Sequence, residues 1–211
     1  GKDIYLTEIS FSNRINPVRL LKDYRELFSV YIAMFLAVFL VFSMYAALAP
    51  PTEQASFDSL LSLISGKATL DFKFFSEIIA HNLLIVVIAF VFSLVYGSGA
   101  VFIVGLNAAT WGVVFANFSA EKAAIAGINP IIYLGLILLI VIWHVVLEGG
   151  AYVSAAISGS IISKAFHREK TFSGRFPSIA RDSLIVLLFS VALVIIAAVV
   201  ETIIAPIVAA I

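Results

Sequence analysis

Residues 128–166, INPIIYLGLILLIVIWHVVLEGGAYVSAAISGSIISKAF, decide the fold of this chain. At about 1.5 Å per residue, a straight helix of this length is nearly twice as long as a bilayer core of about 30 Å. Gly149-Gly150 divides the stretch into a strongly apolar half, residues 131–147, and a half rich in small residues, 151–166. We therefore expect a span followed by a bent or re-entrant helix, or two spans if the glycine pair forms a hairpin.

Four further apolar stretches are long enough to cross a bilayer, which takes roughly 20 residues. They are residues 27–49, 75–96, 98–119 and 183–206. Pro50-Pro51 ends the first stretch, and Gly97-Ser98-Gly99 predicts a tight turn between the second and the third. With residues 128–147 continuing as 148–166, the sequence predicts an all-α, polytopic transmembrane helical bundle. It has five spans, or six if Gly149-Gly150 is a hairpin.

Composition supports a membrane protein and excludes several other classes. The chain is 62% hydrophobic and 12% charged, with a mean hydropathy of +1.11, far from the composition of water-soluble domains. Its formal net charge is zero, so it lacks the overall excess of positive charge that would indicate a nucleic-acid partner. It contains no cysteine, which excludes disulfides and thiolate metal sites. No cofactor is predicted.

Two basic clusters predict how the chain is oriented. The first lies before the first span, in residues 1–26. The second lies in a loop, 164–181, that contains Lys164, Arg168, Lys170, Arg175 and Arg181. Because basic residues favour the cytoplasmic side, we expect a multi-pass protein of the cell membrane. Its N-terminus is then cytoplasmic, its C-terminus is outside, and residues 50–74 form an outer loop.

The polar segments also have helical patterns. In residues 16–28, helical spacing places the apolar residues on one face and the charged residues on the opposite face, as in a helix lying on the cytoplasmic surface. Residues 1–26 are therefore predicted to be a cytoplasmic amphipathic segment. Residues 56–66 predict a short helix in the outer loop. The remainder, 27–211, is predicted to be a single transmembrane domain.

A few polar residues interrupt the apolar spans and are the candidate functional residues. They are Asn82, Asn107, His144, Glu148 and Glu201. A charged carboxylate in hydrocarbon costs several kcal/mol unless it is paired or protonated, so the two glutamates need partners. His144 and Glu148 are four residues apart and share a helix face. A metal site at this pair would need Glu201 or a second subunit as a third ligand.

Depth and packing give two further expectations. Counted from the assigned membrane faces, Asn82 and Glu201 lie in the outer part of the bilayer and His144 and Glu148 nearer the cytoplasm, which argues against one cluster. The asparagines are expected to form hydrogen bonds between helices. Small residues at interface-like spacing predict helix contacts. These residues are Gly105, Gly112, Gly149, Gly150, Ser154, Ser158 and Gly159.

No catalytic motif is present. The sequence has no HExxH, GxSxG, GxGxxG or P-loop, and no aspartate or cysteine lies in a span. No catalytic residue is therefore assigned, and we expect that the chain is not an enzyme.

Several motifs in order resemble the stage II sporulation protein M family of bacterial and archaeal membrane proteins. They are FFSEIIAHNLLI with Asn82, GSGAVFIVGLNAATWG with Asn107, WHVVLEGGAYVSAAISG with His144 and Glu148, and ETIIAPIV with Glu201. In the third motif, Val145 stands where the family has a glycine after the histidine. The resemblance implies a membrane scaffold, because the sporulation member is similar to a scaffold that holds cell-wall-degrading partners.

Three functions remain open at this point. The first, which the sequence favours over the other two, is a scaffold or assembly component that binds other membrane proteins, as the resemblance and the missing motifs indicate. The second is a transporter or channel component that uses the intramembrane Glu, His and Asn side chains. The third is a metal-dependent intramembrane enzyme. Expected partners are the lipid bilayer and either copies of this chain, in a homo-oligomer, or other membrane proteins, with no nucleic acid.

Overall fold

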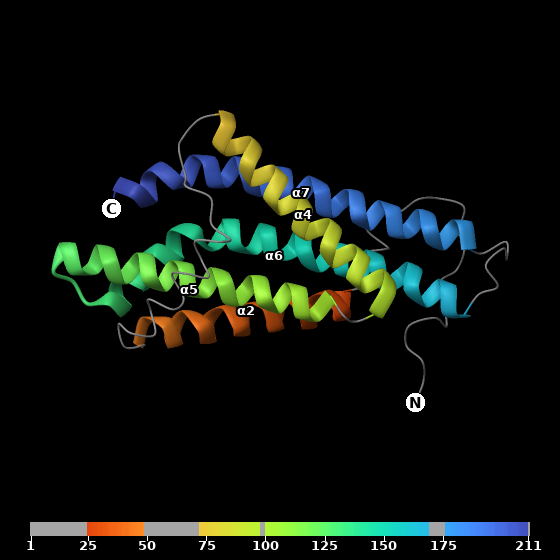
Figure 1. The fold of residues 1–211 in the computed structure, drawn as a ribbon, viewed down its shortest axis with the longest axis horizontal. Coiled ribbons are helices and arrows are strands. Elements are labelled where there is room, and N and C mark those ends of the chain that lie inside the picture. Colours follow the sequence, from red (N-terminus) through yellow and green to blue (C-terminus); the bar gives the residue numbers. More distant parts are fainter. Residues whose placement is uncertain (1–24, 49–71, 98–99, 169–175, 211) are drawn as a thin grey trace.

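A computed structural model of the chain describes residues 25–48, 72–97, 100–168 and 176–210. These residues form α2 (Arg25–Leu48), α4 (Phe72–Tyr96), α5 (Ala100–Ala126), α6 (Pro130–Arg168) and α7 (Phe176–Ala210) (Figure 1). Each of these helices is long and apolar enough to cross a membrane, and the ranges described contain no strand. The predicted all-α bundle of five spans is therefore confirmed.

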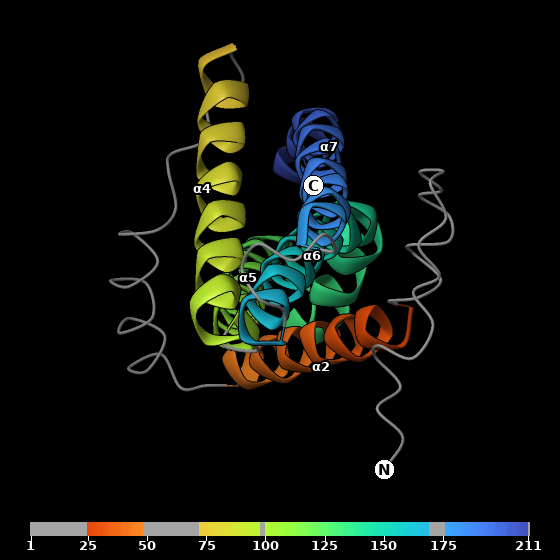
Figure 2. The same ribbon diagram turned by 90° about the vertical axis from the view of Figure 1, so that its right-hand side faces the viewer.

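α6 is the central helix of the bundle. It packs against α7, α4, α5 and α2, and in Figure 2 it lies between α7 and α2, with α5 beside it. Every residue from 148 to 161 is buried. Most of these residues are Gly, Ala or Ser, and their small side chains allow neighbouring backbones to approach closely. The sequence of this half of α6 therefore suits a helix enclosed by other helices rather than one facing lipid.

Gly149 and Gly150 lie inside α6, which continues without a break for 39 residues. The predicted re-entrant segment and the six-span alternative are both wrong, because the small-residue half continues the fourth span. Neither glycine has a positive φ. A Cβ at Gly149 would lie 2.9 Å from the ring of Phe35, and one at Gly150 would lie 3.6 Å from Leu193. The glycines thus mark close packing of α6 on its neighbours, not a turn.

α6 and α7 run antiparallel and are joined by serine hydrogen bonds. Ser158 Oγ donates to the carbonyl oxygen of Ser183 at 2.8 Å, and Ser183 Oγ donates to the carbonyl oxygen of Ser158 at 2.9 Å. Seven residues toward the N-terminus of α6 and seven toward the C-terminus of α7, Ser190 Oγ donates to the carbonyl oxygen of Ala151 at 2.7 Å. A seven-residue step returns to the same helix face. These bonds therefore fix which residues of α6 and α7 lie at the same height.

Two glycines lie where other pairs of helices come closest. A Cβ at Gly112 of α5 would lie 2.9 Å from the backbone nitrogen of Ser43 in α2. A Cβ at Gly159 of α6 would lie 2.7 Å from the Cβ of Ser93 in α4. Gly105 differs, because no atom of the described residues in a neighbouring helix lies within 4 Å of a Cβ built there. The described part of the chain thus shows no close helix contact at Gly105, contrary to the prediction.

Ser154 bonds through its hydroxyl within its own helix. It is buried, but its Oγ donates to the carbonyl oxygen of Gly150 in the same helix at 2.7 Å. Such a bond one turn back satisfies a hydroxyl without a partner helix. Spacing alone did not distinguish Ser154 from Ser158, since both lie on buried faces of α6.

Glycines follow the ends of α4 and α5, and an asparagine precedes the start of α6. Gly97 follows α4 with a φ of 65° and Gly127 follows α5 with a φ of 67°, a conformation that favours glycine. Ser160 Oγ of α6 donates to the carbonyl oxygen of Gly97 at 2.7 Å. At the start of α6, the Ile131 N–H donates to Asn129 Oδ1 at 2.9 Å, an N-terminal cap. The turn between α4 and α5 is thus fastened to α6.

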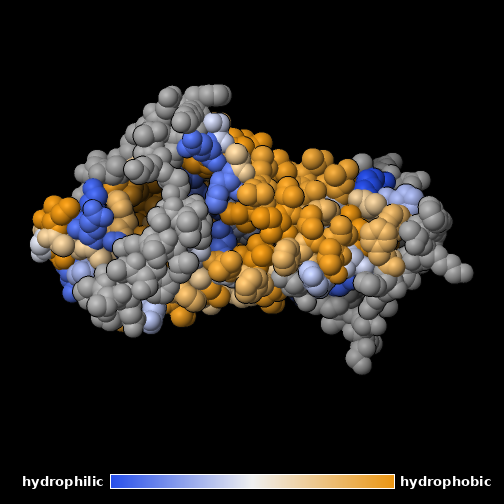
Figure 3. All heavy atoms as spheres, viewed as in Figure 1, coloured by the Kyte–Doolittle hydropathy of each residue, from blue (hydrophilic) through white to orange (hydrophobic). Residues whose placement is uncertain are grey.

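The helices extend beyond the predicted spans. α5 continues through Glu121 and Lys122 to Ala126, and Lys164 and Arg181 lie on α6 and α7 rather than in a loop 164–181. Hydropathy marks only the apolar part of a helix, whereas the helix ends at the next breaker such as Gly127. Figure 3 shows a broad hydrophobic belt across the middle of the face in view.

Two predicted segments fall largely outside the described residues. The surface helix 16–28 is described only from Arg25 onward, where the chain is already part of α2. The short helix 56–66 of the outer loop lies outside entirely.

Candidate functional site

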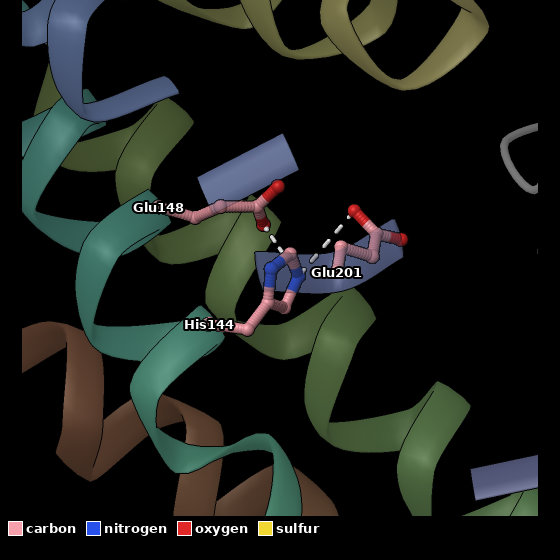
Figure 4. Close-up of side chains that lie close together, drawn as sticks. All are labelled: His144, Glu148 and Glu201. Carbon is pink, nitrogen blue, oxygen red and sulfur yellow. Dashed lines mark ion pairs between the residues drawn. The ribbon is translucent and has the colours of Figure 1, made fainter. Parts of the chain in front are cut away.

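Three ionisable side chains from α6 and α7 meet inside the bundle. His144 and Glu148 project from successive turns of α6, and Glu201 projects from α7 toward them (Figure 4). His144 Nε2 lies 3.5 Å from Glu148 Oε2 and 3.7 Å from Glu201 Oε2. One ligand atom from each residue lies within 4.8 Å of the others. We call these three residues the His-Glu-Glu cluster.

The prediction that depth separates these residues is wrong. It placed the outer face of the membrane near the end of the apolar stretch at 206, but α7 continues to Ala210. The register of α6 and α7 is set instead by their seven-residue repeat, in which His144 Nδ1 lies 3.4 Å from the carbonyl oxygen of Ala197. Glu201 is one turn beyond Ala197. Since Cβ atoms tilt toward the N-terminus of a helix, its side chain leans back to the level of His144.

Asn82 links α4 to the cluster. Its Nδ2 donates to Glu148 Oε1, and its Oδ1 accepts a hydrogen bond from the Tyr152 hydroxyl at 2.8 Å. Tyr152 is fully buried. Tyr152 and Glu148 together provide partners for the amide of Asn82, which would cost roughly 1–3 kcal/mol if it were buried without them. The hydrogen bond from Asn82 in turn fixes which carboxylate oxygen of Glu148 faces away from the histidine.

Sequence reasoning missed Tyr152, although a signal was present. Tyr152 lies four residues after Glu148 and eight after His144, so the three share one face of α6. A tyrosine at the end of an i, i+4, i+8 row of polar residues, within a helix rich in small residues, is unusual enough to make Tyr152 a candidate functional residue.

Asn107 of α5 is not joined to this network by a side-chain hydrogen bond in the described part of the chain. Its Nδ2 atom is buried without a hydrogen-bond partner among the described residues. Four of the five intramembrane polar residues selected from the sequence, Asn82, His144, Glu148 and Glu201, therefore belong to one connected group, which joins α4, α6 and α7.

The imidazole of His144 is held on two sides. Its Nδ1 faces the Ala197 carbonyl oxygen, and its ring packs against Trp111 of α5 with ring centroids 4.8 Å apart. A carbonyl at Nδ1 favours the tautomer with a proton there, which leaves a lone pair on Nε2. Nε2 is buried and has no hydrogen-bond partner in the described part of the chain. The nitrogen directed at both carboxylates is thus the unsatisfied one.

Burial differs among the three residues. The side chains of His144 and Glu148 are 3% and 2% exposed, whereas that of Glu201 is 26% exposed. Two exposed residues of α4, Glu77 and His81, lie outside the cluster. The cluster therefore reaches the surface of the described structure at Glu201.

Positive charge near the cluster is scarce. α6 has no lysine or arginine before Lys164, and the only one in α7 is Arg181, twenty residues from Glu201 in sequence. Two carboxylates and an imidazole in a low-dielectric interior attract cations strongly, since any positive charge removes the cost of burying them. Chemically, the arrangement suits the binding of a cation or proton.

The chain was compared with known proteins. The family model described as Stage II sporulation protein M matches residues 29–206. No curated protein and no solved structure matches the chain. The family match covers α4, α5 and α6 and most of α2 and α7, and it includes Asn82, Asn107 and the His-Glu-Glu cluster. With most of its length matched by that model, the chain belongs to the stage II sporulation protein M family.

Proposed function

We propose that this protein is a membrane transport component in which the His-Glu-Glu cluster binds a cation partway across the bilayer. The observation that carries the proposal is His144 Nε2, a buried nitrogen that lies between two carboxylates and has no hydrogen-bond partner among the residues that the structure describes. An unsatisfied buried polar atom costs roughly 1–3 kcal/mol. A cluster needed only for stability would gain nothing from it, whereas a binding site needs a free donor or acceptor.

The position of the cluster along the bundle supports a transport role. Ser160 contacts Gly97 in the turn between α4 and α5. Glu148 lies twelve residues before Ser160, which is about 18 Å along the helix. If the turn lies near one face of a hydrocarbon core of about 30 Å, the cluster is close to the midplane. Sites for transported ions commonly lie there.

The orientation follows from the basic residues, and it too is a proposal. Lys164 and Arg181 lie toward the α6–α7 connection, which we place in the cytoplasm of a cell membrane together with the N-terminus. Lys122, at the far end of α5, then faces outside. Because the chain has no cysteine, single variants Lys122→Cys and Lys164→Cys test this with an impermeant maleimide on intact cells. We expect labelling only at residue 122, and labelling only at residue 164 would reverse the topology.

A scaffold is the second candidate, and a specific observation favours it. The α4–α6 and α6–α7 contacts are made by glycine and serine backbones and hydroxyls, as at Gly159 and Ser158. Such contacts resist the large movements that many transporters make. In this role the partners are other membrane proteins or further copies of this chain, and the protein is not an enzyme. A metal-dependent enzyme remains the third candidate.

Flux measurements on reconstituted protein separate these candidates. Purified wild-type protein and the Glu148→Gln variant are placed in liposomes, and influx is followed with a pH-sensitive dye and a Zn²⁺-sensitive dye under an imposed gradient. We expect flux above that of empty liposomes, reduced at least tenfold by Glu148→Gln. Glu77→Gln, which neutralises an exposed glutamate outside the cluster, should leave it unchanged. No flux of either ion through monodisperse wild-type protein would reject transport and favour the scaffold.

A further inference from the structure

We propose that the His-Glu-Glu cluster is a binding site for a divalent transition metal of the zinc class. Its ligands are His144 Nε2, Glu148 Oε2 and Glu201 Oε2. The inference deepens the proposed function by naming the class of cation. It also assigns a role to Glu201, the one residue of the cluster that is partly exposed.

Two of the three separations among the ligand atoms, which all lie within 4.8 Å of one another, fit a metal better than they fit hydrogen bonds. Nε2 is 3.5 Å and 3.7 Å from the two carboxylate oxygens, beyond the roughly 2.7–3.2 Å of an N–H···O hydrogen bond. Ligand atoms bound tetrahedrally at about 2.0–2.2 Å from zinc are about 3.4 Å apart. The two separations are thus close to the edges of a zinc coordination tetrahedron.

The surrounding residues orient the ligands as metal sites require. Metal-binding histidines usually donate their other ring N–H to a carbonyl or carboxylate, and His144 Nδ1 faces the Ala197 carbonyl oxygen. The carboxylate of Glu148 is held in turn, because Asn82 donates to its Oε1. Oε2 is left for the metal. Both supporting contacts come from other helices, α7 and α4, so the site exists only in the folded bundle.

Charge selects a divalent ion over a monovalent one. Two ionised glutamates carry a charge of −2, and a neutral imidazole adds none. A divalent cation makes the complex neutral, as protonation of both carboxylates also would, whereas one Na⁺ leaves an uncompensated negative charge in a low-dielectric interior. The nearest cationic side chains in α6 and α7, at Lys164 and Arg181, are many residues away. An electrically neutral complex is the form that a membrane interior tolerates best.

The donor atoms select the zinc class among divalent ions. Ca²⁺ takes six to eight oxygen ligands and Mg²⁺ keeps octahedral oxygen coordination. An imidazole nitrogen with two carboxylate oxygens suits Zn²⁺ and its neighbours in the first transition row. Three protein ligands leave a fourth position open for water or another ligand. The partial exposure of Glu201 gives that position a route to the surface.

The test uses the full chain, purified in detergent through a tag without histidine and stripped of metal with a chelator. Zn²⁺ is then added and bound metal is measured after gel filtration, and Co²⁺ is used as an absorption probe of coordination geometry. We expect one metal per chain and the intense visible bands of tetrahedral Co²⁺. Substoichiometric binding to the wild type, or octahedral Co²⁺ spectra alone, would overturn the proposal.

Variants separate loss of a ligand from loss of fold. Glu201→Gln and His144→Ala should weaken Zn²⁺ binding at least 100-fold. Glu201→Gln is the decisive variant, because a partly exposed isosteric change keeps the fold, as its melting profile should show. His81→Ala removes an exposed histidine of α4 outside the cluster and should bind like the wild type. Unchanged binding by folded Glu201→Gln would reject the assignment.

Failure of this inference can be told from failure of the proposed function. Stoichiometric, Glu201-dependent metal binding without flux would support the metal site and reject transport. Proton flux that depends on Glu148, without metal binding, would support transport and reject the metal site.

Discussion

Replacement of Gly159 by alanine should destabilise the bundle, although alanine is the better helix former. The added methyl would lie 2.7 Å from Ser93 Cβ and 2.9 Å from the backbone nitrogen of Leu94, and would overlap the carbonyl oxygen of Phe90. Overpacking costs about 1–3 kcal/mol, and we take the upper end because most of the atoms met are backbone. After about 1 kcal/mol of helix propensity is regained, the net loss is about 2 kcal/mol.

Gly105→Ala is the matched control, since the same change in α5 meets no atom of the described neighbouring residues within 4 Å. It should gain up to about 1 kcal/mol. For a chain of this size, 1 kcal/mol corresponds to about 2–4 °C in Tm. Thermal unfolding in detergent, followed by tryptophan fluorescence, should therefore place Gly159→Ala about 4–8 °C below the wild type and Gly105→Ala at or above it. Equal melting of the two variants would refute the close approach of α4 and α6.

Three other sets of variants test the remaining contacts. Ser158→Ala and Ser183→Ala should each destabilise the protein by about 1 kcal/mol. Their double-mutant cycle should show a coupling energy, because the two hydroxyl oxygens also lie 2.9 Å apart; additive effects would contradict this direct contact. Gly149→Ala should lower the stability less than Gly159→Ala does, because the added methyl meets the side-chain ring of Phe35 rather than backbone. Phe35→Leu added to Gly149→Ala should restore the Tm, and lack of rescue would place the strain elsewhere. Asn82→Ala should weaken Zn²⁺ binding about 10–100-fold by freeing the buried carboxylate, and unchanged affinity in metal titrations would exclude a positioning role.

Local patterns predicted the elements of the fold well. Long apolar stretches gave the five spans, and Gly97 marked a helix end where the backbone needs a positive φ. They did not predict how far each helix continues, because hydropathy reports contact with lipid rather than helix ends. The glycine pair in α6 was misread for a similar reason. A glycine that relieves crowding at Phe35 and one that begins a hairpin are identical in sequence, and only the neighbouring helix distinguishes them.

The members of the polar group were also selected from the sequence, because each interrupts an apolar span where a polar side chain is costly. Their convergence was not predicted. Residue counting assumed that each helix fills the membrane from face to face, but α6 and α7 are longer than a bilayer core. The partners of each residue therefore depended on the register between helices.

The sequence by itself determined that this protein is a helical membrane bundle of the stage II sporulation protein M family, and which polar residues it retains inside its spans. Spacing and hydropathy act within one helix, so they carry that information. Only the tertiary structure decided that Glu201 of α7 meets His144 and Glu148 of α6 and that Asn82 of α4 supports them. Register between helices arises from packing of small residues and serine hydrogen bonds across interfaces, and it is a property of no single segment.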